Sequence, residues 1–170
     1  MNHRTKRVAF LGLAVSLALI LSYVESLLPP LWAAVPGIKM GLPNVVLMFL
    51  LYRFSWREAA AVSALRILLA SMLFGNPTTM LYSAAGALVS LTLMALLRRF
   101  DRHSVVGVSV AGGVAHNFGQ ILTAMVVLQT QQIGYYMIVL VFTGTVAGIC
   151  VGLAGAALLR YSARIDKFLK

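Results

Sequence analysis

The chain consists largely of apolar runs of about 20 residues, separated by short polar or Pro/Gly-rich segments. A run of this length lets an α-helix cross a hydrocarbon core of ~30 Å, where every backbone group must find its hydrogen-bond partner within the chain. Of the residues, 61% are hydrophobic and 11% are charged, whereas about a quarter are charged in a soluble domain. The sequence therefore predicts an all-α, polytopic membrane protein.

Six transmembrane helices in one bundle account for these runs. No long linker divides the chain, so we expect a single integral membrane domain over residues 1–170. The first apolar run is too long for the apolar region of a signal peptide and is assigned to a span. The second span is short for a crossing. The predicted spans are residues 8–28, 42–52, 58–74, 79–97, 105–128 and 135–160.

Lysine and arginine alternate between the two sides of the predicted bundle. They gather at the N-terminus, after the second and fourth spans and in the C-terminal tail, whereas the other three loops contain one basic residue, Lys39. The positive-inside rule therefore predicts that both termini lie in the cytoplasm, and we expect the protein in the plasma membrane. The net charge of +10 then reports topology and not a nucleic-acid partner, which would need a clustered basic face.

Three hydrogen-bonding side chains interrupt the fifth span: His116, Asn117 and Gln120. On a helix they fall within an arc of ~100°, opposite a large apolar face. Polar side chains are costly against lipid, so this polar stripe faces the bundle interior or a cavity. The stripe either forms hydrogen bonds that hold neighbouring helices together or lines a ligand site. One histidine without a second ligand nearby does not predict a metal site.

Arg66 lies near the centre of the third span, with small residues on its helix face. A charge at this depth costs ~2.5–3.5 kcal/mol even on the scale of membrane insertion that gives the lowest cost, so the guanidinium needs a hydrogen-bond acceptor. Glu25 is the acidic residue deep enough to provide one. The alternatives are a structural Arg66–Glu25 pair and an Arg66 that meets an anionic or carbonyl-bearing ligand.

The loop before the second span contains Lys39 and leads to Asn44. Its prolines and glycines exclude a regular helix. Irregular backbone is tolerated at membrane depth only where it packs against protein or lines a water-filled cavity. We expect either a loop that covers a ligand or an ordinary connector. Small residues also recur every four positions in the first, fifth and sixth spans, a pattern that favours close packing between helices or docking of another membrane protein.

Four stretches together resemble the Gx transporter family, also labelled heptaprenyl diphosphate synthase component I: PGIKMGLPN, LRILLASMLFG, YSAAGALVSL and HNFGQILTA. The resemblance covers roughly residues 8–158. Pro43 departs from the small residue that the family pattern has at this position, at the start of the second span. The positions that match the family signature are Lys39, Gly41, Asn44, Arg66, Gly75, His116, Asn117 and Gln120.

The family is similar in layout to the S components of energy-coupling-factor transporters. The resemblance implies a six-helix protein that binds a small vitamin-like molecule under its first loop and works with a transmembrane coupling protein and ATPases. Ala14 and Ala18 match the pair that contacts this coupling protein. The predicted substrate-binding residues are Lys39, Asn44, Arg66, His116, Asn117 and Gln120, with Tyr82 at the outer end of the fourth span.

An enzymatic role is not expected, and no cofactor is predicted. A prenyl diphosphate synthase needs paired acidic residues to hold Mg²⁺, and this chain has four acidic residues, none of them paired. A phosphate-binding loop for ATP is also missing from the sequence. The first hypothesis is a transport subunit for a small anionic or carbonyl-rich ligand that is vitamin-, quinone- or isoprenoid-like. The second is a non-catalytic accessory of isoprenoid or quinone metabolism or of membrane electron transfer, and the third a purely structural membrane subunit.

Overall fold

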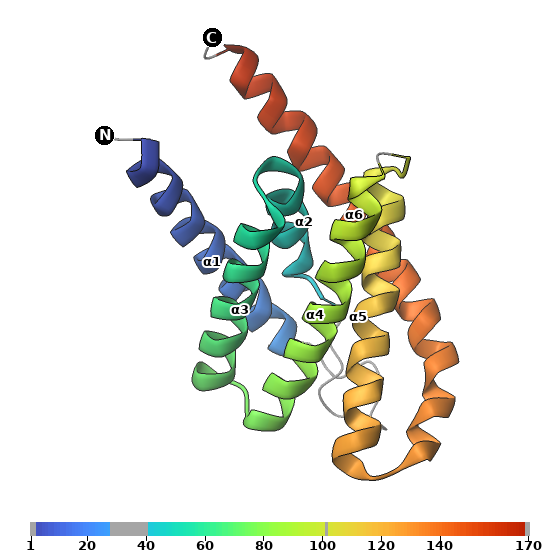
Figure 1. The fold of residues 1–170 in the computed structure, drawn as a ribbon. Helices are drawn as coiled ribbons and strands as arrows, with labels where there is room; N and C mark the ends of the chain where they lie inside the picture. The colour runs from blue at the N-terminus through green and yellow to red at the C-terminus, as the bar shows by residue number, and fades with distance from the viewer. Residues whose placement is uncertain (1–2, 28–40, 101, 169–170) are drawn as a thin grey trace.

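The structure is a computed structural model that describes residues 3–27, 41–100 and 102–168. Within these residues it is all-helical, which confirms the predicted fold class (Figure 1). A short 3₁₀ helix, η1 (Gln131–Tyr136), precedes the last helix. The six α-helices of the described residues are α1 (His3–Leu27), α2 (Asn44–Arg53), α3 (Trp56–Leu73), α4 (Pro77–Arg99), α5 (Val105–Leu128) and α6 (Met137–Phe168).

Side-chain caps set the starts of three helices. Ser55 accepts a hydrogen bond from the Glu58 amide at the start of α3, and Ser104 accepts one from the Gly107 amide at the start of α5. Asn76 and Thr79 form a reciprocal capping box at the start of α4, where a proline occupies the first turn. These caps satisfy amides that have no partner within the helix, so each helix begins within two residues of its predicted span.

The start of α2 depends on Gly41. This glycine has a φ of +84°, and a Cβ built on it would lie 2.6 Å from the Asn44 side-chain nitrogen. A residue with a side chain would therefore be strained there and would collide with Asn44. Pro43 is buried directly before the first residue of α2, so the helix begins at Asn44 and not at residue 42 as predicted.

The helices pack as a bundle in which α4 contacts both α3 and α5, while α6 contacts α5 and α2. The helix α1 packs against α3 and α2. The start of α1 and the end of α6 lie at the same end of the bundle as the α2–α3 turn and the connection between α4 and α5 (Figure 1). This arrangement brings together the ends at which the basic residues cluster.

Four helical segments are long and apolar enough to cross a membrane: Arg4–Leu27, Pro77–Arg99, Val105–Val127 and Gln131–Ala163. The structure thus has the character of a multi-pass membrane protein. The helix α2 has 10 residues, and α3 carries three charged residues, Arg57, Glu58 and Arg66. Crossings by α2 and α3 remain predictions.

Glycines bring α5 and α6 into close contact. A Cβ on Gly148 would lie 2.6 Å from the Val110 Cα, and one on Gly152 would lie 2.8 Å from the Val106 Cα. Real Cβ atoms do not approach backbone so closely, so both positions need glycine. The small-residue pattern of the sixth span therefore serves internal packing.

Candidate functional site

A set of polar side chains is buried inside the apolar bundle. They come from α1, α3, α4 and α5, and each is at most 7% exposed. Buried polar groups are normally hydrogen-bonded, and their partners indicate which of them hold the fold together. Among the described residues, the buried polar side chains are Ser22, Glu25, Ser63, Arg66, Ser83, Ser90, Ser109, His116, Asn117 and Gln120.

Arg66 is 5% exposed and contacts α1 through one hydrogen bond. Its Nη1 donates to the Ser22 Oγ over 3.4 Å, at the long end of hydrogen-bond distances. Its Nε has no hydrogen-bond partner among the described residues. The guanidinium is thus buried with part of its donor capacity unused.

Glu25 lies one turn beyond Ser22 on α1 and is 7% exposed. Its carboxylate attracts the Arg66 charge and accepts a hydrogen bond from the Gly41 amide. This carboxylate therefore ties the described end of the first loop to α1, close to the arginine of α3. Glu25 and Arg66 thus belong to one polar cluster with Ser22 and Gly41, two residues that sequence reasoning did not assign to it.

The polar stripe of α5 divides between two neighbouring helices. The Asn117 Nδ2 donates to the Leu140 carbonyl of α6 over 2.8 Å, so Asn117 acts as a link between helices. A Cβ built on Gly86 of α4 would lie 2.9 Å from the His116 Cε1 and 3.0 Å from the Gln120 Cγ. His116 and Gln120 therefore pack against α4, where the glycine makes room for them.

Gln120 differs from Asn117 in its hydrogen bonding. Its side chain is 1% exposed, and neither its Nε2 nor its Oε1 has a partner among the described residues. An amide has two donor hydrogens and an acceptor oxygen, and burying it unpaired costs about 1–3 kcal/mol. Packing alone would be served better by an apolar side chain of the same length.

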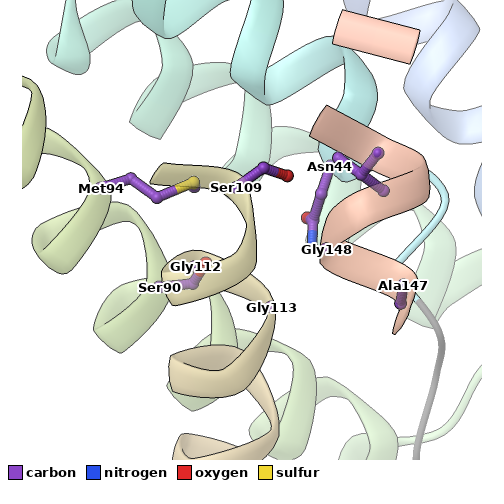
Figure 2. Close-up of a pocket in the computed structure, with 9 residues that line it drawn as sticks. Asn44, Ser90, Met94, Ser109, Gly112, Gly113, Ala147 and Gly148 are labelled. Carbon is purple, nitrogen blue, oxygen red and sulfur yellow. The ribbon is translucent and has the colours of Figure 1, made fainter. Parts of the chain in front are cut away.

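Asn44 lines a small cavity where α2 meets α4, α5 and α6 (Figure 2). The cavity has a volume of about 10 Å³, which is enough for roughly one water molecule. The Ser90 Oγ borders this cavity and has no partner among the described residues. Sequence reasoning did not identify Ser90 or Ser109, because serines are common in apolar helices and their role depends on which helices meet. The cavity is lined by Asn44, Ser90, Met94, Ser109, Gly112, Gly113, Ala147, Gly148 and Val151.

The remaining predicted site residues have varied surroundings. Tyr82 is 3% exposed in an apolar cluster with Ile121 and Leu140, one helical turn from Gly86. Lys39 lies outside the described residues. No group of three His, Cys, Asp or Glu side chains that could hold a metal ion occurs within the described ranges.

Ala14 and Ala18 are 7% and 0% exposed within the protein's own core. In this structure they pack internally, which is one of the two uses expected for small-residue patterns. A partner interface at these positions would require α1 to expose them, and it remains a prediction.

Comparison with known proteins gives one match. The family described as heptaprenyl diphosphate synthase component I matches residues 14–158, which include all of α2 to α5 and most of α1. No curated protein and no solved structure matches the chain. Because the family match extends over most of the sequence, the chain belongs to the heptaprenyl diphosphate synthase component I family.

Proposed function

We propose that this protein is a non-catalytic membrane subunit that binds a small anionic or carbonyl-rich ligand within its helical bundle and takes part in its transport. We assign the ligand contacts to six of the seven residues predicted from the sequence: Lys39, Asn44, Arg66, Tyr82, His116 and Gln120. Asn117 would support the site by holding α5 against α6.

The observation that carries this proposal is the buried polar capacity that the described residues leave unused. The Arg66 Nε and both amide atoms of Gln120 have no hydrogen-bond partner there. A central charge costs ~2.5–3.5 kcal/mol in a membrane, and an unpaired buried amide costs about 1–3 kcal/mol more. A bound ligand that supplies acceptors for Arg66 and a partner for Gln120 would offset these costs.

The chemistry of these groups indicates the class of ligand. A guanidinium offers only donors and pairs best with carboxylate, phosphate or carbonyl oxygens. The Glu25 carboxylate already attracts Arg66 and holds the Gly41 amide. An anionic ligand would therefore compete with Glu25 for Arg66. Its binding would also affect the end of the first loop, where the Glu25 carboxylate accepts the hydrogen bond from Gly41.

A transport role follows the resemblance to the S components. Because the chain has no phosphate-binding loop for ATP, energy for uptake would come from a coupling protein with ATPases. We place both termini and the basic loops in the cytoplasm, so that the first loop and Lys39 face outward in the plasma membrane.

A second candidate function rests on the family description, which names a component of heptaprenyl diphosphate synthase. In this role the protein would be the non-catalytic membrane partner of a catalytic component and would present or move an isoprenoid. Its four acidic residues are scattered through the sequence, so the Mg²⁺-binding carboxylates would come from that partner.

Mass spectrometry of small molecules that copurify in mild detergent tests the proposal and separates the two roles. A water-soluble, vitamin-like anion would favour transport, whereas a prenyl diphosphate or quinone would favour the accessory role. The same extraction from Arg66→Lys should show at least a tenfold loss of affinity, about 1.4 kcal/mol, because lysine lacks the planar fork.

Arg98→Lys is the matched control, because the donors of Arg98 contact the backbone carbonyls of Leu51 and Tyr52. It should retain the ligand. If Arg66→Lys and Arg98→Lys both keep wild-type amounts of ligand, Arg66 does not serve the ligand.

A further inference from the structure

A second cavity lies along α4 between Leu88 and the basic end of this helix. It is a groove of about 840 Å³ between the α2–α3 turn and one face of α4, within the size range of ligand sites. The α4 side is formed by residues three and four positions apart, from Leu88 to Leu96, and the opposite wall includes Phe54 and Ala60. Figure 1 shows α3 and α4 joined at one end and separating toward this turn.

The groove is mainly apolar, with Ser55 and Thr92 as its uncharged polar lining residues, and it is basic where it ends. Arg98 and Arg99, the last residues of α4, both line it, and none of its lining residues is acidic. Arg98 is fixed in the wall: its Nη2 donates to the Tyr52 carbonyl over 3.1 Å, and its guanidinium carbon lies 5.1 Å from the Tyr52 ring centre. Arg99 is exposed, and no side-chain hydrogen bond or ion pair within the described ranges involves its guanidinium.

Among the described residues, Glu58 does not neutralise this end of the groove. Glu58 accepts hydrogen bonds from Arg7 and from the Ser55 hydroxyl, so its charge is already matched. Trp56 also lines the groove, with the Arg57 guanidinium 5.9 Å from its ring centre. Tryptophan and arginine in this combination are typical of the boundary between hydrocarbon and headgroups.

We propose that this groove is a specific binding site for an anionic phospholipid of the adjoining leaflet. The acyl chain would lie along the apolar face of α4 from Leu88 to Leu96, and the phosphate would pair with Arg99. The argument is charge complementarity: a mainly apolar groove that ends at an arginine with no carboxylate partner among the described residues fits an amphiphile with a negative head. A neutral partner helix would leave Arg99 unpaired.

Native mass spectrometry in detergent, with phosphatidylglycerol and phosphatidylcholine of identical acyl chains, tests the proposal. The wild type should bind phosphatidylglycerol preferentially. Arg99→Gln should reduce that preference about fivefold, because this is the factor in binding that one basic residue contributes at an anionic membrane surface. Arg102→Gln is the control, because Arg102 is exposed at the same end but does not line the groove.

A second pair of variants tests the groove itself. Ala95→Trp fills it and should reduce binding of both lipids, whereas Ala84→Trp, at an exposed position of α4 outside the groove, should not. Equal binding of the two lipids by the wild type would overturn the proposal. So would a preference that survives both Arg99→Gln and Ala95→Trp, or a polyprenyl phosphate that copurifies in place of phospholipid and is lost in Arg99→Gln.

Discussion

Replacing Gln120 by methionine should stabilise the ligand-free protein. Gln120 is 1% exposed, and its two amide atoms have no partner among the described residues. Methionine keeps the unbranched chain through Cγ, the atom that lies closest to Gly86, and removes the polar atoms. Relief of one unpaired buried polar group is worth about 1–3 kcal/mol, so Gln120→Met should raise the free energy of unfolding by about that amount.

Asn117→Leu provides a matched control on the same helix. It removes the 2.8 Å hydrogen bond to the Leu140 carbonyl. Hydrogen bonds between membrane helices are worth about 0.6 kcal/mol on average and up to about 1.7, so this variant should lose stability by a similar amount. The two amides, three residues apart, should therefore respond with opposite signs.

Unfolding of ligand-free protein by titration of dodecyl sulfate into dodecylmaltoside micelles, followed by circular dichroism, measures both effects. Gln120→Met should also bind ligand more weakly than the wild type, and His116→Leu should weaken binding while the protein stays folded. A loss of stability in Gln120→Met as large as that in Asn117→Leu would show that the whole polar stripe stabilises helix packing. It would refute the ligand site at Gln120.

Three further predictions concern topology and packing. In a Cys150→Ala background, cysteine at Gln131 should react with an impermeant thiol reagent in whole cells and cysteine at Arg102 should not; the reverse pattern would invert the predicted orientation. Gly148→Ala should destabilise the protein by about 1–3 kcal/mol in the same dodecyl sulfate titration, because its methyl group would press on the backbone of α5. Asn76→Ala should cost about 1 kcal/mol through loss of the capping box, and a thermal melt with no change in midpoint would show that this cap is dispensable.

The helices were predictable because their signals are local. Apolar runs, caps such as Ser104 and the Pro77 start of α4 depend on neighbouring residues, and the predicted boundaries lie within a few residues of the observed ones at most helix ends. The last helix is the main exception: it continues to Phe168, past the predicted end at residue 160. The short second helix was predicted from its apolar run, but its start at Asn44 depends on the left-handed Gly41, which an apolar pattern does not reveal.

The candidate site was predictable as a list of polar residues but not as a set of contacts. Sequence spacing put His116, Asn117 and Gln120 on one arc, yet Asn117 turns to α6 while the other two pack against Gly86 of α4. Which neighbour each side chain meets depends on the order of the helices in the bundle. For the same reason Ser22 as the partner of Arg66 could not be read from the sequence.

Ligand retention by a double variant, Arg66→Met with Glu25→Gln, tests the central claim most directly. Removing both charges together avoids stranding one of them in a low-dielectric interior, so the double variant should fold, whereas either single change should destabilise strongly. We predict that the folded double variant, purified in mild detergent, carries no copurified ligand by mass spectrometry. A folded double variant that retains ligand with wild-type affinity would contradict the account, because Arg66 and Glu25 would then be a structural pair alone.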